Sequence, residues 1–214
     1  MYKKLFITIC ILLLLVGCTK ENINTESLDE IIDNSIASET KAKANVNAKG
    51  FKYNLPSGFN LYKDSGYIHE LHSKNYVYYL NVDIISYFYK NDITTVHELD
   101  DYEYYEFDNK DEENTKKGYL RITKNNDNFF VELCYNYAII EVEVKDSDLR
   151  YTVSRGMNIL KSIEYNDLVI EKLINDGESD IRETVYKIPE PEKKNTKNIL
   201  EYIGEDEEAE EDEE

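Results

Sequence analysis

Three neighbouring segments between residues 119 and 144 alternate apolar and polar side chains, and this pattern restricts the fold more than any other part of the chain. Side chains on a β-strand point to opposite faces in turn, so these segments are expected to form strands with one buried face. The apolar sides are Phe129, Val131, Leu133 and Tyr135 in the second segment and Ala138, Ile140, Val142 and Val144 in the third. The sequence Asn125-Asn126-Asp127-Asn128 is typical of a hairpin turn. The pattern therefore predicts an antiparallel meander with one covered face.

A helix that follows the meander is the predicted cover, which makes the expected fold class α+β. Ser147 and Asp148 are candidate cap residues, because their side chains can accept from the first amide groups and acids suit the positive end of the helix dipole. An apolar stripe follows at spacings of four, four and three, namely Leu149, Val153, Met157 and Leu160. Gly156 lies beside this stripe. Glycine costs about 1 kcal/mol relative to alanine inside a helix, which indicates a close approach of helix to sheet. The helix is expected to end near Ser162.

Three strands are predicted in the first part of the domain, at residues 51–55, 66–72 and 76–89. In the longest, 76–89, the even-numbered positions are nearly all apolar and the odd-numbered ones include polar residues, so one face should be buried and the other partly wet. Tyr79, Tyr87 and Tyr89 share the wetter face. Tyrosine offers an apolar body with a polar tip, so these three form a candidate recognition face. Packing beneath a second layer is an equally good interpretation.

The other segments give weaker signals. Residues 92–99 are expected to form a short helix or a loop, residues 102–107 an edge strand, and residues 108–117 a charged loop. Residues 168–174 continue as a helix or a strand.

The chain opens with Lys3 and Lys4, then an apolar run from Leu5 to Val16 that ends at Leu15-Val16-Gly17-Cys18. A run of about twelve residues has the length of a secretory signal, whereas a membrane-spanning helix needs about twenty. The last four residues resemble the lipobox of bacterial lipoproteins. The resemblance implies a diacylglycerol thioether on Cys18, cleavage between Gly17 and Cys18, and a mature protein anchored to the cell membrane and facing away from the cytoplasm. Two acyl chains suffice for stable anchoring.

The predicted division of the chain has five parts. These are a signal peptide (1–17), a flexible stalk (18–49), an α+β domain (50–166), an extension (167–203) and a disordered acidic tail (204–214). The stalk is polar and lacks aromatic residues. Leu28, Ile31, Ile32 and Ile36 could line one face of a short helix, either transient or docked on a partner. Between Glu205 and Glu214 nearly every residue is acidic, so the tail should remain solvated and could collect Ca²⁺ or Mg²⁺ weakly.

The chain carries 25 Lys and Arg against 44 Asp and Glu, a net charge of −19. Nucleic acid is excluded as a partner, because neutralising phosphates requires clustered basic residues. An internal disulfide is also excluded, since Cys10 lies in the signal and Cys18 would take the lipid. Cys134 is then expected to be a small apolar side chain in a strand.

A family resemblance accompanies this order of elements. An early strand with Leu55-Pro56-Ser57-Gly58-Phe59, a meander, a late helix and then Ser162-Ile163-Glu164-Tyr165 together resemble the PsbP/Mog1-like α/β sandwich, over about residues 50–166. The resemblance implies a binding or assembly role and supplies no functional residue.

Candidate chemistry is sparse. His69 and His72 are three residues apart, which places them on opposite faces of a strand and is wrong for one metal ion, and His97 has no ligand-like neighbour. The acidic run 108–114 lacks the order of a calcium loop. Signatures of nucleophilic catalysis and zinc proteases are absent from the sequence. No catalytic residue, cofactor or metal is therefore predicted.

Three hypotheses of function remain. The first is a lipid-anchored, non-enzymatic module that binds another envelope protein or assists assembly. The second is a ligand-binding lipoprotein for uptake or sensing, which a closed pocket of at least ~300 Å³ beneath the helix would favour. The third, an envelope hydrolase, would require a cleft with convergent acids or histidines.

Overall fold

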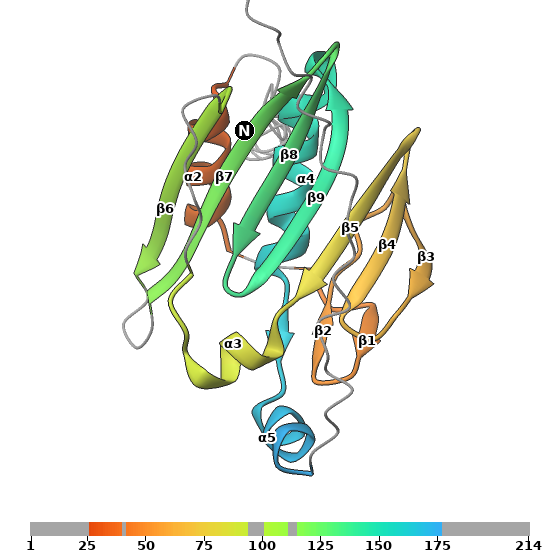
Figure 1. Ribbon diagram of the computed structural model, residues 1–214, viewed down its shortest axis with the longest axis vertical. Coiled ribbons are helices and arrows are strands. Elements are labelled where there is room, and N and C mark those ends of the chain that lie inside the picture. The colour runs from red at the N-terminus through yellow and green to blue at the C-terminus, as the bar shows by residue number, and fades with distance from the viewer. Residues whose placement is uncertain (1–25, 40–41, 94–100, 111–114, 177–214) are drawn as a thin grey trace, which may run out of the picture. The chain divides into compact units, whose positions relative to one another are not determined.

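Seven antiparallel strands form the larger of two sheets in the computed structural model, which describes residues 26–39, 42–93, 101–110 and 115–176 (Figure 1). The spatial order is β3-β4-β5-β9-β8-β7-β6. The strands are β3 (Phe59–Asp64), β4 (Ile68–Ser73), β5 (Tyr76–Val82), β6 (Glu103–Lys110), β7 (Thr115–Asn125), β8 (Asn128–Tyr135) and β9 (Ala138–Lys145). The described residues thus form a mixed α+β fold with antiparallel sheets, and the predicted meander is confirmed as β7, β8 and β9.

The register of the meander follows from its alternating side chains. Leu120 pairs with Leu133, and Leu133 pairs with Ile140, so the apolar side chains of three strands share one face. The two turns that join these strands contain residues with positive φ, including Asn126 at 54° and Asn136 at 49°. Asparagine tolerates this conformation better than most residues, which explains why the turns lie there.

Helix α4 (Leu149–Lys161) lies against β8 and β9 on this apolar face. The predicted stripe of Leu149, Val153, Met157 and Leu160 is buried. A Cβ added to Gly156 would lie 2.9 Å from Leu133 Cδ2, so the predicted close approach of helix to sheet is confirmed. Asp148 is the N-cap residue, as predicted, but its side chain makes no bond to the helix start. Its carboxylate accepts instead from Lys74 Nζ at 2.6 Å and from the Tyr76 hydroxyl at 2.8 Å.

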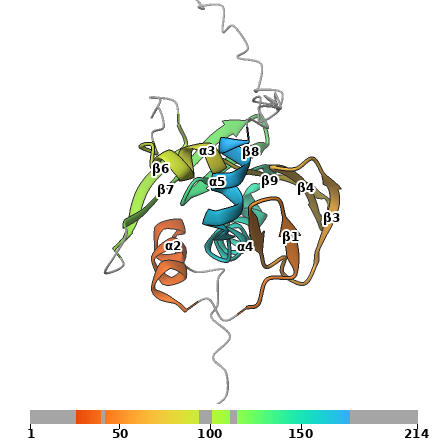
Figure 2. The same cartoon turned by 90° about the horizontal axis from the view of Figure 1, so that it is seen from below.

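The prediction of a flexible stalk up to Lys49 needs correction, because helix α2 (Leu28–Ala37) belongs to the folded unit. Ser27 and Glu30 form a capping box: the Ser27 amide donates to Glu30 Oε2 at 2.9 Å, and the Glu30 amide donates to Ser27 Oγ at 3.4 Å. Leu28, Ile31 and Ile32 are buried, and α2 packs against α4 (Figure 2). The apolar stripe of α2 packs against α4, so the polar composition of this segment did not predict that it is folded.

Lys161 of α4 fixes the other end of α2. Its Nζ donates to the main-chain oxygens of Ser35, Ile36 and Ser38. The last carbonyl groups of a helix have no partner within the helix, and a lysine can satisfy them. Burial, with a smaller contribution from nearby Lys116, lowers the pKa of Lys161.

A second sheet begins before the predicted domain boundary at residue 50. Its order is β1-β2-β10, with β1 (Val46–Ala48), β2 (Phe51–Tyr53) and β10 (Glu164–Tyr165). Helix α5 (Asp167–Asn175) follows and buries Ile170 and Leu173. The predicted boundary at residue 166 is therefore too early, and the ambiguous segment 168–174 is a helix. The remainder of the predicted extension and the acidic tail lie outside the described residues.

The long strand predicted over residues 76–89 is wrong. Strand β5 ends at Val82, and helix α3 (Ile84–Tyr89) follows directly. Asp83 starts the helix, because its side chain accepts from the Ser86 amide at 2.8 Å. The predicted charged loop is also shorter than expected, since β6 extends to Lys110 and β7 begins at Thr115.

The packing of α2 predicts that shortening Ile32 destabilises the protein. Ile32 is fully buried, whereas Ile36 on the same helix is only half-buried. Ile32→Ala should lower the free energy of unfolding by about 2–4 kcal/mol, because a buried cavity remains. Ile36→Ala should cost distinctly less. Urea unfolding of both variants measures this difference. Equal and negligible losses would contradict the inclusion of α2 in the fold.

Candidate interaction site at the edge of the sheet

The three tyrosines of the predicted recognition face do not share one strand, because Tyr79 belongs to β5 whereas Tyr87 and Tyr89 belong to α3. Tyr79 lies on β5, on the sheet face opposite α4, which we call the outer face. The Tyr87 ring of α3 stacks on Tyr165 with centroids 3.8 Å apart, and its hydroxyl donates to Asp167 Oδ1 at 2.8 Å. Tyr89 is 60% exposed. Helix α3 begins after Asp83, and the contacts of Tyr87 dock this helix near α5.

The two described histidines point to opposite faces of β4, as the spacing predicted. His69 is buried, with its Nδ1 hydrogen-bonded to the Tyr53 hydroxyl at 2.8 Å and its Nε2 3.3 Å from Asp64 Oδ1. His72 Nε2 donates to Glu70 Oε1 at 2.6 Å on the other face. Burial lowers the pKa of His69, although Asp64 acts in the opposite direction. His97 lies outside the described residues, and within those residues no three potential metal ligands come together.

The outer face carries a cross-strand row that sequence reasoning missed. The row runs through Glu70, Tyr79, Glu141, Glu132, Arg121 and Tyr104. Arg121 Nη2 donates to Glu132 Oε2 at 2.8 Å, and the Tyr119 hydroxyl donates to the other oxygen of Glu132. Burial and the neighbouring Glu132 raise the pKa of Glu141 to about 7, against the pull of Arg121. Six of the seven strands contribute one residue each, so only the register of the sheet could have revealed the row.

Cys134 also lies on the outer face, between Tyr119 and Ile139 of the adjacent strands. It is buried, and burial raises the pKa of its thiol to about 12. The prediction of an apolar side chain in a strand is confirmed. Such a thiol is protonated at neutral pH and therefore a poor nucleophile.

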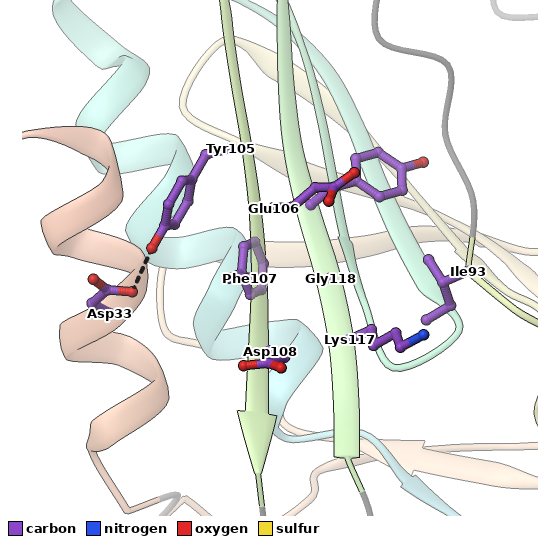
Figure 3. A pocket seen from close by; sticks show the side chains of 9 residues that line it. Asp33, Ile93, Tyr105, Glu106, Phe107, Asp108, Lys117 and Gly118 are labelled. Carbon is purple, nitrogen blue, oxygen red and sulfur yellow. Dashed lines mark hydrogen bonds between the residues drawn. The ribbon is translucent and has the colours of Figure 1, made fainter.

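A hollow of about 560 Å³ lies at the edge formed by β6 (Figure 3). Its lining includes Asp33 of α2, Tyr105, Glu106 and Asp108 of β6, and Lys117 of β7. The Tyr105 hydroxyl donates to Asp33 Oδ1 at 2.9 Å and so joins strand to helix. We call this surface, defined by Asp33, Tyr105, Glu106, Phe107, Asp108 and Lys117, the β6-edge site.

An aromatic ring forms the rigid wall of the β6-edge site. Phe107 pairs directly with Gly118. A Cβ added to Gly118 would lie 2.5 Å from Phe107 Cε2 and 2.4 Å from the Cys134 oxygen, so the ring lies in the space that a side chain would need. Phe107 also stacks between Tyr105 and Tyr135, at centroid distances of 5.9 and 6.1 Å. The φ of Gly118 is not positive, so its backbone conformation does not require glycine. Glycine is required because the ring approaches too closely for any side chain.

The two edges of the larger sheet differ in regularity. Strand β3 has a register shift between Leu61 and Lys63, and such irregularities discourage pairing with another strand. Strand β6 pairs with β7 over eight consecutive residues without a shift. Among the described strands, β6 is therefore the edge better suited to accept an additional strand.

A second hollow, of about 580 Å³, lies beside β2, β10 and α5 and includes Lys49, Tyr165 and Leu168 in its lining. Both hollows lie away from the α4 interface. There Val153 and Met157 of the helix and Leu133 and Ile140 of the sheet each expose at most 1% of their surface. This filled interface counts against a ligand pocket beneath the helix.

Family models, curated proteins and solved structures yield no match to this chain. The resemblances to the lipobox and to the PsbP/Mog1-like sandwich therefore stay predictions. Among the described residues, no helix has the length and apolar character needed to cross a bilayer.

The environment of Glu141 predicts a pH-dependent stability. Its folded pKa of about 7 exceeds the ordinary value of 4.5, so the native state holds an extra proton between these values. The contribution of Glu141 to the free energy of unfolding is therefore fully present below pH 4.5. It is lost as the pH rises through 7, by up to about 3 kcal/mol. Glu141→Gln should remove this fall.

The measurement is urea unfolding of wild type and Glu141→Gln between pH 4.5 and 8. His69 contributes with the opposite sign, because its lowered pKa makes stability rise with pH, so the difference between the two proteins isolates Glu141. Parallel stability curves for the two proteins would contradict a raised pKa at Glu141.

Proposed function

We propose that this chain is a lipid-anchored, non-enzymatic envelope protein that binds another envelope protein through the β6-edge site. The observation that carries the proposal is the regular edge strand β6 beside α2, with a hollow of about 560 Å³ along it. Exposed strand edges are common sites of polypeptide recognition. The signal sequence ending at Cys18 supplies the proposed anchor and the location outside the cytoplasm.

The anchor proposal has a geometric consequence for where the domain acts. Seven residues separate Cys18 from Glu26, at which the described structure begins. A fully extended segment of this length spans at most about 25 Å. In the proposed lipoprotein the folded unit therefore stays close to the membrane surface, and its partner is a membrane-proximal protein.

The absence of an enzymatic role is part of the proposal and is supported by the state of individual groups. His69 is buried and hydrogen-bonded to Tyr53, which removes it from contact with a substrate. Cys134 is buried, and its raised pKa keeps the thiol protonated. The carboxylate of Glu132 is bonded to Arg121 and Tyr119. These contacts suit stabilisation of the sheet better than catalysis.

The finer fold assignment belongs to the same proposal. We propose a sandwich of the PsbP/Mog1-like kind, with α4 and α2 as one layer and the seven-stranded sheet as the other, followed by a solvated acidic tail. The contacts of α4 with β8 and β9 support the layered part of this assignment.

The anchor proposal predicts that Cys18→Ala releases the protein from membranes or traps an unprocessed precursor. Cys134→Ala is the matched control, because it removes a buried cysteine and leaves the lipidation motif intact. Membrane fractionation and mass measurement of the mature protein report both variants. Normal processing and full membrane retention of Cys18→Ala would refute the anchor.

The binding proposal predicts that reversing charge at the β6-edge site prevents recovery of an envelope protein. Crosslinking in cells, followed by purification of the tagged full chain, should recover a partner with wild type and lose it with Asp33→Lys combined with Glu106→Lys. Glu171→Lys on the exposed surface of α5 is the control and should behave as wild type. Equal recovery with all three chains would place the partner elsewhere on the molecule.

A further inference from the structure

We infer that the partner adds an extended segment to β6 as a new strand, and that this segment alternates basic and apolar side chains. The inference rests on the proposed function and specifies the mode of binding and the chemistry of the partner. It draws on three observations: the direction of the main chain in β6, the alternation of its side chains, and the charge of its surroundings.

The main-chain groups of Glu106 point away from β7. The Lys117 oxygen accepts from the Asn136 amide at 2.9 Å, which shows that the Lys117 main chain faces β8. The main-chain N–H and C=O groups of successive residues point to opposite neighbouring strands, so those of Gly118 point to β6, where Gly118 pairs with Phe107. The main-chain groups of Phe107 therefore point to β7. Those of Glu106, the residue before it, point outward, away from the sheet. A strand laid along this edge can exchange hydrogen bonds with Glu106.

The side chains of β6 alternate in chemistry between its two faces. Glu106 and Asp108 lie on the outer face, whereas Tyr105 and Phe107 lie on the face toward α2 (Figure 3). An added strand presents its side chains to the same two faces in turn. The segment that would complement β6 places basic residues beside the carboxylates of Glu106 and Asp108. It places apolar residues beside the rings of Tyr105 and Phe107.

The charge around the edge favours a basic partner over a second copy of this chain. Among the charged residues that line the hollow, Asp33, Glu106 and Asp108 outnumber Lys117, whose Nζ lies 3.5 Å from Asp92. Strand β6 carries three acids and one lysine, so pairing two copies would bring like charges together.

The test uses the full chain purified in detergent and two labelled synthetic peptides. The first peptide alternates lysine and valine, and the second replaces each lysine with glutamate. Fluorescence anisotropy should show binding of the lysine peptide, weakening as salt is added, and at least roughly tenfold weaker binding of the glutamate peptide. Equal binding of the two peptides, or none of either, would overturn the inference.

Two substitutions at one position separate the main-chain contribution from the charge. Glu106→Pro removes the outward N–H without removing a bond to β7, and should weaken binding of the lysine peptide roughly tenfold or more. Glu106→Gln retains the N–H and should weaken binding by only a few-fold. Thermal unfolding confirms that each variant is folded. Wild-type binding by a folded Glu106→Pro variant would overturn strand addition.

The outcomes distinguish this inference from the proposed function. If crosslinking in cells recovers the same envelope protein with wild type and Glu106→Pro, the proposed binding of an envelope protein is supported and binding by strand addition is contradicted. If crosslinking recovers no envelope protein while the lysine peptide still binds as described, the inferred surface chemistry stands and the proposed function falls. Self-association of the wild type that Glu106→Pro abolishes would identify a second copy as the occupant and overturn the basic partner.

Discussion

The contact between α4 and the apolar face of β8 and β9 is the interaction on which the rest of the structure depends. Gly156 allows the helix backbone to approach Leu133, and Met157 and Val153 of the same helix are fully buried. Burial of these side chains fixes the register of the central strands, because a shift of one residue would turn every apolar side chain to the wrong face. The register then continues through β7 to β6 without interruption, so the position of the edge is set by the core.

Helix α2 links the proposed membrane anchor to that core. Its apolar stripe packs on α4, Lys161 binds its last carbonyl groups, and Asp33 accepts the hydrogen bond of Tyr105. The same helix therefore follows the proposed tether, stabilises α4 and flanks the edge strand. A partner on β6 would contact the element nearest to the anchor, which fits an interaction close to the membrane.

The sequence predicted the parts of the fold that depend on local periodicity. The alternation over β8 and β9 and the stripe of α4 depend on one burial pattern each, and both predictions hold. The prediction of one long strand over residues 76–89 was wrong because the same alternating pattern also fits a strand followed by a short helix. The contact that decides between them is the hydrogen bond of the Asp83 side chain at the start of that helix. The inclusion of α2 in a flexible stalk was wrong because this helix is stabilised by packing against α4, which lies more than a hundred residues later in the chain.

The candidate site could not be predicted from the sequence for a related reason. Asp33, Tyr105 and Lys117 come from three separate segments, and only the pairing of β6 with β7 and the docking of α2 bring them together. Tyr87 and Tyr89 lie on α3, after Asp83, and so do not belong to the same strand as Tyr79.

The most direct test of the account places a photoreactive amino acid at position 106 of the full chain in living cells, with the same substitution at position 171 of α5 as the comparison. Illumination should join position 106, and not position 171, to a single envelope protein, and the linked residue of that protein should lie in a segment that alternates basic and apolar side chains. An adduct that forms from position 171 and not from position 106 would contradict the assignment of the interaction to the β6 edge.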